Sequence, residues 1–247
     1  MNSASDILLQ SVRLYKTNAA TIGGYLAWLL LPFAGLILVD LVPNEETAAV
    51  LGIFLVLIQI VLSIWISLFL IRLVQDLSKN IKPDVPELQR KIRGWIGPLL
   101  IVTVLTTLSI IGGLLLLIIP GIMFFIWFSF AQISVVLDGK RGMDALSHSR
   151  SLVKGRFFKT AWMVLSGPIF SLILYTLILA TIVATISLLT GQNLDAALAE
   201  SPPAWIIVID MLGQLFILLP ILLIYHVLVY EEFKKPRSEK EKVEKQG

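Results

Sequence analysis

The chain has 247 residues, of which 57% are hydrophobic and 15% are charged, and its mean hydropathy is +0.87. Soluble proteins average about 45–50% apolar and about 25% charged residues, so this chain lacks the polar residues that would cover a soluble domain. The composition excludes an ordinary soluble enzyme and a disordered chain. The absence of cysteine excludes disulfides, thiolate nucleophiles, Cys-bound metals and lipid anchors attached through cysteine.

Long stretches without a formal charge mark the predicted membrane spans. A span needs about 20 apolar residues, so the uncharged stretch 94–137 is long enough to cross twice. We expect its turn at Ile119-Pro120-Gly121, where proline and glycine disfavour a continuous helix. The sequence therefore predicts an all-α, polytopic integral membrane protein with six transmembrane helices. They are placed at about 20–41, 48–74, 96–119, 121–138, 160–190 and 203–230.

The basic residues are confined to one side of these spans. All 20 Lys and Arg residues precede the first span, follow the last one, or lie between spans two and three or four and five. The other connections hold Asp40, Glu45, Glu46, Asp195 and Glu200 but no basic residue. By the positive-inside rule, we predict a multi-pass protein of the cytoplasmic membrane with both termini in the cytoplasm. The net charge of +3 reflects this asymmetry and does not indicate a nucleic-acid partner.

Amphipathic segments accompany the spans on the predicted cytoplasmic side. The residues before the first span and residues 143–157 each place apolar side chains on one helical face, as helices in the lipid headgroup layer do. The segment 75–95 is mixed, and Pro83 and Pro86 are expected to break it. We predict a single membrane domain over 1–232 and a charged, disordered cytoplasmic tail over 233–247.

The order of segments suggests a threefold plan, in which a basic segment precedes each pair of spans. The units would be 1–74, 75–139 and 140–233. No residue-by-residue repeat accompanies this plan, which favours its being a by-product of six alternating spans over a true internal repeat. Pro32, Pro168 and Pro220 are expected to kink the first, fifth and sixth spans.

Asp210 is the formal charge that lies deepest inside a predicted span. Gln214 follows one turn later on the same face, and Gly213 permits close packing nearby. An intramembrane carboxylate is by default a functional candidate, because it can bind a cation, a proton or a lipid amine. The structural alternative is that Asp210 hydrogen-bonds a neighbouring helix or reaches the outer interface.

Basic residues near spans four and five are candidate contacts for lipid headgroups. Arg150, Lys154 and Arg156 lie close to one another in the sequence, and each basic residue near an anionic membrane surface contributes about 1 kcal/mol. Membrane lipids, and anionic phospholipid in particular, are therefore predicted partners, beside an unidentified protein. The alternative is that these residues only set the topology.

No cofactor or metal is predicted, because His148 lacks companions at metal-ligand spacing and His226 suits an interface anchor.

Residues 117–159 carry a recognisable pattern. It consists of Pro120-Gly121-Ile122, an aromatic-rich helix, Asp138-Gly139, Ala145-Leu146, Ser149 and a Leu-Val-Lys-Gly-Arg stretch around Gly155. This pattern resembles a group of prokaryotic six-helix membrane proteins, which includes the membrane domain of glycerophosphoryl diester phosphodiesterase and the YciC-like inner-membrane proteins. The resemblance implies a six-helix fold in the membrane. It implies no reaction, because the metal-binding carboxylates and histidines of a soluble phosphodiesterase domain are not expected here.

These observations favour a non-enzymatic membrane protein that acts through lipid or protein contacts in envelope or membrane maintenance. A small transporter or channel that uses the face carrying Asp210 and Gln214 is the first alternative. A membrane subunit for a glycerophosphodiester or phospholipid enzyme is the second. Ser149 is not expected to be catalytic, because no His/Asp partner or nucleophile elbow accompanies it, and we predict no catalytic residue.

Overall fold

The computed structural model describes residues 3–39, 41–191 and 203–235, which are helical almost throughout. The helices are α1 (Ala4–Leu26), α2 (Leu30–Val39), α3 (Glu45–Ser78), α4 (Val85–Leu116), α5 (Ile118–Phe128), α6 (Ala131–Asp138), α7 (Gly142–Val153), α8 (Phe157–Thr190), α9 (Ala204–Gly213) and α10 (Leu219–Lys234). A short 3-10 turn, η1 (Ala27–Leu29), joins α1 to α2. A π-helical segment, η3 (Gln214–Leu218), joins α9 to α10.

Six helical stretches are long and apolar enough to cross a membrane, which confirms the predicted fold class. They are Ala4–Val39, Glu45–Ser78, Val85–Leu116, Ile118–Asp138, Phe157–Thr190 and Ala204–Lys234. The structure therefore has the architecture of a multi-pass membrane protein.

The amphipathic N-terminal segment and the first span form one bent helical stretch. α1 begins with a capping box in which Ser3 and Asp6 exchange hydrogen bonds with each other's main-chain N–H groups. The bend lies at Asn18, whose φ of −120° and ψ of 18° leave the helical region. The Asn18 side chain donates a hydrogen bond to the Leu14 carbonyl oxygen at 2.9 Å. The bend lets the polar segment and the apolar span take different directions.

The turn between α4 and α5 lies at Leu117, and not at the expected Pro120-Gly121. Leu117 is extended, with φ −166° and ψ 153°. Pro120 instead occupies the first turn of α5, where a missing N–H leaves no hydrogen bond unmade. Gly121 allows the two helices to approach, because a Cβ at this position would lie 2.4 Å from the Leu114 side chain. A second break, at 129–130, separates α5 from α6 and was not predicted.

Two further boundaries differ from the sequence analysis. α4 takes Pro86 into its first turn, so this proline starts a helix and does not break one. α10 continues to Lys234 and buries Phe233, so the last helix extends past the predicted start of the tail. The rest of that tail, residues 236–247, and the connection 192–202 lie outside the described residues.

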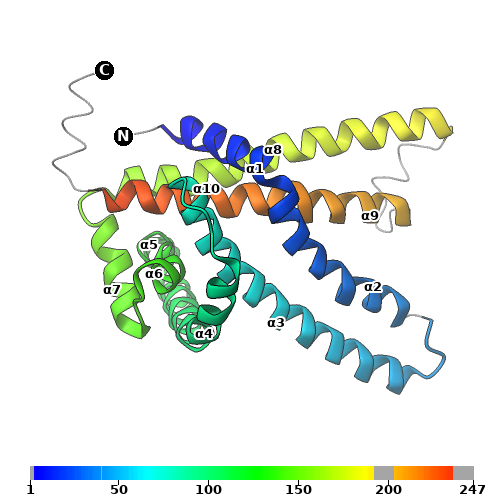
Figure 1. Ribbon diagram of the computed structural model, residues 1–247, viewed down its shortest axis with the longest axis horizontal. Coiled ribbons are helices and arrows are strands. Elements are labelled where there is room, and N and C mark those ends of the chain that lie inside the picture. The colour runs from blue at the N-terminus through cyan, green and yellow to red at the C-terminus, as the bar shows by residue number, and fades with distance from the viewer. Residues whose placement is uncertain (1–2, 40, 192–202, 236–247) are drawn as a thin grey trace.

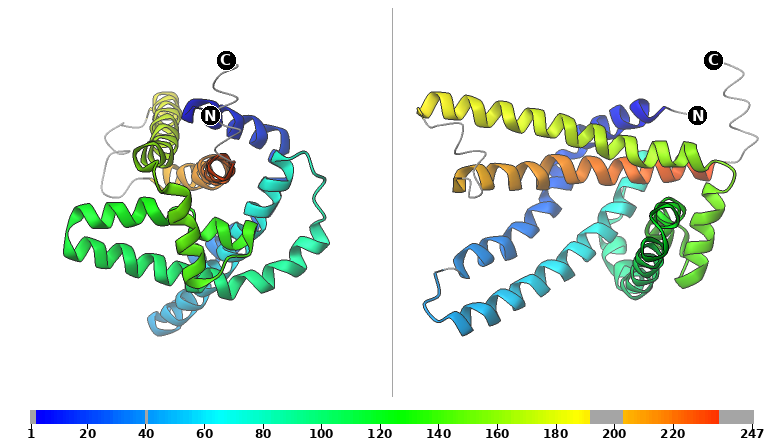
Figure 2. Two further views of the ribbon diagram at one scale, coloured as in Figure 1. Left: turned by 90° about the vertical axis from the view of Figure 1, so that its left-hand side faces the viewer. Right: turned by 180° about the vertical axis from the view of Figure 1, so that it is seen from behind.

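The six spans pair as three consecutive hairpins that share one end and diverge from it. α2 packs against α3, α4 against α5, and α8 against both α9 and α10. Figure 1 shows the α4–α5 pair nearly end-on, while the other two pairs run across the view. The left panel of Figure 2 shows the α4–α5 pair from the side. The divergence leaves apolar side chains uncovered at the far ends, such as Leu115 (83% exposed) and Leu189 (82% exposed).

The shared end, which we call the base, holds the most closely packed part of the core. It comprises the N-terminal part of α1, the C-terminal ends of α3, α6 and α10, the start of α4, and α7. Phe69, Phe130, Tyr225 and Tyr230 are completely buried there. The apolar face of α7, expected in the headgroup layer, instead covers α4, α5 and α6. The α7 residues buried in this way are Ala145, Leu146, Ser149 and Val153.

Candidate functional site

The Asp210 carboxylate is held by two neutral side chains from two helices. The hydroxyl oxygen of Tyr175, on α8, lies 2.7 Å from both Oδ1 and the main-chain carbonyl oxygen of Asp210. Gln214 donates a hydrogen bond to Oδ2 at 2.9 Å. Gly213 makes room for this arrangement, because a Cβ there would lie 2.7 Å from the Tyr175 hydroxyl oxygen.

The structure thus places Asp210 and Gln214 together, as their spacing on one helix requires, and adds Tyr175, which the sequence analysis did not single out. Within the described part of the chain, Asp210 forms no ion pair. The site is an intramembrane carboxylate whose observed partners are neutral. Such a group can accept a proton or a cation without displacing a lysine or arginine.

Tyrosine hydroxyls satisfy main-chain carbonyls near two of the prolines. Pro220 has no N–H to donate to the Phe216 carbonyl oxygen four residues earlier, and the Tyr15 hydroxyl of α1 donates to that oxygen instead. Pro168 similarly disturbs the hydrogen bonding of the preceding turn of α8. There, the Tyr225 hydroxyl donates to the Met163 carbonyl oxygen at 2.6 Å. These bonds tie α1 and α8 to the last span.

Side chains from α7 and α10 form hydrogen bonds with the backbone groups left unpaired at the break between α5 and α6. The Ser149 hydroxyl accepts a hydrogen bond from the Phe130 N–H at 3.1 Å and donates one to the Trp127 carbonyl oxygen at 2.7 Å. The His226 Nε2 lies 3.2 Å from the Ser129 carbonyl oxygen. Unpaired backbone groups in an apolar environment cost several kcal/mol each. Ser149 therefore has a structural role at this break.

Other residues of the sequence pattern also occupy positions that packing explains. Ala145 is completely buried where α7 meets the core. Gly155, between α7 and α8, has a φ of 77°, which favours glycine because a Cβ is strained in this region. Gly121 permits the close approach of α4 and α5 described above. The pattern thus marks the turns and contacts of α4 to α8.

Asp138 joins α6, α7 and α10 at the base. Its carboxylate accepts a hydrogen bond from the Tyr230 hydroxyl and pairs with the Lys234 ammonium group, both on α10. The His148 Nε2 of α7 lies 3.1 Å from an Asp138 carboxylate oxygen and 3.3 Å from the Tyr230 hydroxyl oxygen. Of these partners, Tyr230 lies 82 residues from His148 in the sequence, whereas Asp138 ends the neighbouring helix α6. In the described ranges, no three His, Asp or Glu side chains are grouped so that they could hold a metal ion.

A second polar network connects the end of α3 to α10. The Gln75 side chain donates to Glu231 at 2.5 Å, and the Lys79 ammonium group lies 3.4 Å from the same carboxylate. Arg72 pairs with Asp76 at 3.3 Å. These charged groups satisfy one another, so the network stabilises the contact between two helices.

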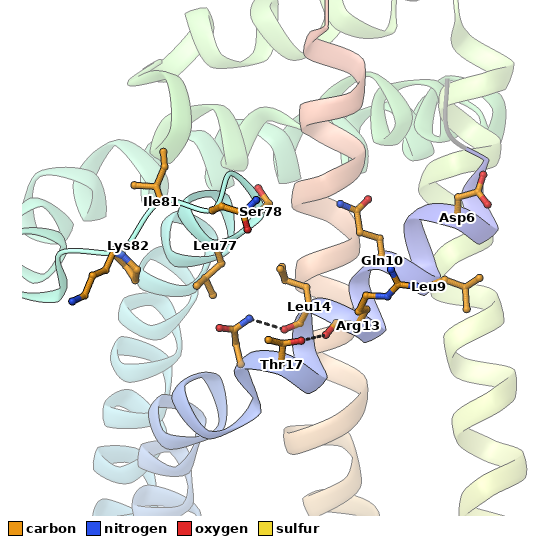
Figure 3. Close-up of a pocket in the computed structure, with 13 residues that line it drawn as sticks. Asp6, Leu9, Gln10, Arg13, Leu14, Thr17, Leu77, Ser78, Ile81 and Lys82 are labelled. Carbon is orange, nitrogen blue, oxygen red and sulfur yellow. Dashed lines mark hydrogen bonds between the residues drawn. The ribbon is translucent and has the colours of Figure 1, made fainter. Parts of the chain in front are cut away.

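A cavity of about 920 Å³ opens at the base between α1 and the connection from α3 to α4 (Figure 3). Leu14 and Leu77 contribute apolar lining, and Arg13 and Lys82 contribute two positive charges. Neither cation pairs with an acidic side chain of the described residues. The carboxylate of Asp6, which also lines the cavity, is already bonded to Ser3. With two cations and one carboxylate among its lining residues, the cavity has a net positive and amphipathic lining.

The predicted headgroup contacts lie around the connection from α7 to α8. The Arg150 guanidinium lies 4.3 Å from the centre of the Trp127 ring. Lys154 is exposed at the end of α7. Arg156 immediately precedes α8, and its Nη1 atom is buried without a hydrogen-bond partner. None of the three forms an ion pair with another described residue, so no acidic side chain of the described ranges neutralises their charges.

Packing, turn conformation and hydrogen bonding thus explain the residues that resemble the six-helix group. The resemblance itself stays a prediction. Comparison with known proteins returns no match for this chain among protein-family models, curated proteins or solved structures.

Proposed function

We propose that this protein is a non-enzymatic protein of the cytoplasmic membrane that binds anionic phospholipid at its base and serves in membrane or envelope maintenance. The main observation behind this proposal is that the lysines and arginines cluster at the base. Most of those that the structure describes have no acidic partner among the described residues. Ion pairs engage only Arg72, Lys79, Lys91, Lys234 and Lys235 in these ranges. The remaining cations are Arg13, Lys16, Lys82, Arg90, Arg93, Lys140, Arg141, Arg150, Lys154, Arg156 and Lys159.

The proposal includes the orientation of the chain, with the base and both termini on the cytoplasmic side. The base collects the ends of helices that carry basic residues, while the three connections at the far ends of the hairpins contain no Lys or Arg in the sequence. Cytoplasmic leaflets carry anionic lipid, and the positive-inside rule gives the same direction. Unpaired cations at this level would face lipid phosphates.

Lipid is favoured over a protein partner because the exposed surface has two properties that an anionic phospholipid matches. The hairpins expose apolar side chains over most of their length, and the base exposes unpaired cations. The polar groups that the structure brings together, including Ser149 and Asp138, serve helix contacts, which supports the non-enzymatic assignment.

The test is native mass spectrometry of the full chain, extracted from its own membrane in mild detergent, with retained lipids identified. We expect the wild-type protein to retain anionic phospholipid. The double variant Lys154→Glu/Arg156→Glu is expected to bind phosphatidylglycerol at least about 30-fold more weakly, which corresponds to about 1 kcal/mol per lost cation. Equal retention of phosphatidylglycerol and phosphatidylcholine by the wild-type protein would overturn the proposal.

The second candidate function is transport of a proton or small cation past Asp210. The specific observation is an intramembrane carboxylate whose partners, Tyr175 and Gln214, are neutral. An intact carboxylate is required for such transport, and asparagine at this position can still accept a hydrogen bond from Tyr175. We therefore expect Asp210→Asn to fold normally and to abolish any pH-dependent flux in proteoliposomes. Equal flux for wild type and variant, or none for both, would remove this function.

A further inference from the structure

The first turns of α4 carry a basic hollow on their outer side. Pro86, Gln89, Arg90 and Arg93 line this hollow, whose volume is about 470 Å³. Neither arginine pairs with an acidic side chain of the described residues. Glu87, the acidic residue of the same turns, is bound to Lys91 at 2.6 Å. The hollow therefore presents two uncompensated guanidinium groups.

An apolar groove of about 450 Å³ lies between α3 and α4. Residues Phe54, Leu57, Val61 and Trp65 of α3 and Ile96 of α4 contribute to its lining. These side chains are accessible from outside the protein, since Phe54 is 60% and Val61 is 66% exposed. The groove offers an apolar chain a surface on two helices at once, which a single helix face does not.

The hollow and the groove adjoin on α4. Arg93 and Ile96 are three residues apart, so they are neighbours on one helical face, about 4.5 Å apart along the axis. From Trp65 to Phe54 the groove runs along α3 away from the base for about 16 Å. One leaflet of a bilayer has a hydrocarbon layer of about 15 Å. A basic site at the base is thus followed by an apolar groove one leaflet long.

We propose that this outer face of α3 and α4 binds one glycerophospholipid with an anionic headgroup. Arg90 and Arg93 hold the phosphate, because guanidinium groups bind phosphate oxygens in a two-pronged geometry. One acyl chain lies in the groove from Trp65 to Phe54. A zwitterionic headgroup binds more weakly, because its ammonium group adds a positive charge next to the two arginines. The inference rests on the proposed function and names a specific site for the lipid.

The experiment cross-links the full chain in nanodiscs to phospholipids that carry a photoreactive diazirine on an acyl chain, and maps the modified peptides by mass spectrometry. We expect several-fold more adducts on residues 54–65 with a phosphatidylglycerol probe than with a phosphatidylcholine probe. Arg90→Gln/Arg93→Gln should reduce the phosphatidylglycerol adducts to the phosphatidylcholine level. The matched control is Lys140→Gln/Arg141→Gln, which removes two unpaired cations of the base elsewhere and should leave adducts on 54–65 unchanged.

A second pair of variants tests the groove without changing charge. Val61→Trp fills the groove and should lower the phosphatidylglycerol adducts on 54–65 several-fold. Val104→Trp is its control, because Val104 is also exposed (56%) but lies on α4 outside the groove lining. Each variant is checked for an unchanged thermal unfolding temperature, so that a loss of adducts is not a loss of fold.

The outcomes separate the two proposals. If native mass spectrometry shows a preference for phosphatidylglycerol, but adducts on 54–65 depend on neither headgroup nor Arg90 and Arg93, the site inference is wrong and the proposed function stands. If the wild-type protein shows no headgroup preference in either measurement, both are wrong. Equal loss of adducts in the Lys140→Gln/Arg141→Gln control would also overturn the site, because the effect would then be general electrostatic attraction.

Discussion

Single side chains in this protein take over backbone hydrogen bonds where its helices are interrupted. Ser149 bonds to both sides of the break between α5 and α6, and Tyr15 donates to the carbonyl that faces Pro220. In the lipid interior, no water is present to hydrogen-bond an unpaired backbone N–H or carbonyl group. The interruptions are therefore tolerated only because specific hydroxyl groups lie next to them.

Replacing Ser149 by alanine is expected to destabilise the fold. The Phe130 N–H and the Trp127 carbonyl would lose their side-chain partner in the buried core, which costs about 1–3 kcal/mol of unfolding free energy. The measurement is the thermal unfolding temperature in detergent. Ser151→Ala, which removes an exposed hydroxyl of the same helix, should leave this temperature unchanged. Equal temperatures for both variants would contradict the structural role of Ser149.

Residue partnerships could be predicted from the sequence only where both partners lie on one helix. Asp210 and Gln214 are one turn apart, so their shared face follows from helical periodicity. Tyr175 is 35 residues from Asp210, and Tyr230 is 92 residues from Asp138. No local pattern connects such positions. The cluster around Asp138 and the role of Ser149 therefore required the tertiary structure.

At the scale of helices, contacts between spans depend on small residues opposite large ones. The ring of Tyr225 on α10 lies against Gly167 of α8, where an added Cβ would lie 2.2 Å from it. Tyr225 is completely buried and donates to the Met163 carbonyl oxygen. Because burial and this hydrogen bond hold the ring in place, Gly167 permits the close approach of the two helices.

Gly167→Ala is expected to separate α8 from α10 locally and to lower the unfolding free energy by about 1–3 kcal/mol, as overpacking of a core does. Unfolding in detergent, followed by circular dichroism, gives the measurement. Gly112→Ala on α4 is the matched control, since nothing lies within 4 Å of its added Cβ. A Gly167→Ala protein as stable as this control would show that α8 and α10 are not held at this contact.

The six spans could be predicted because charge and hydropathy alone decide which segments enter lipid. Helix ends are harder to predict from the sequence, because proline breaks a helix in its interior but is favoured in its first turn. Pro86 and Pro120 lie in first turns, where a missing N–H is harmless, and the sequence analysis treated both as breaks. The break at 129–130 carries no local signal, because its stabilising groups, Ser149 and His226, belong to other helices.

For the whole molecule, the base and the far ends of the hairpins are expected on opposite sides of the membrane. The sequence has no cysteine, so single cysteines can be introduced without background. We expect Glu46→Cys, at the far end of the first hairpin, to react with a membrane-impermeant maleimide in intact cells. Ser147→Cys, exposed on α7 at the base, should react only after lysis. The reverse result would place the base outside the cytoplasm and remove the proposed contact with its anionic leaflet.

The break between α5 and α6 also has a consequence for synthesis. Because the chain is synthesised from its N-terminus, this span is made before the residues whose side chains hydrogen-bond to its break. Ser149 follows soon after, but His226 comes 97 residues later than Ser129. Asp138 likewise waits for Tyr230 and Lys234 of α10. The fourth span therefore reaches its final bonding only when the last one is inserted, and chains truncated within that last span should be preferred substrates of membrane quality-control proteases.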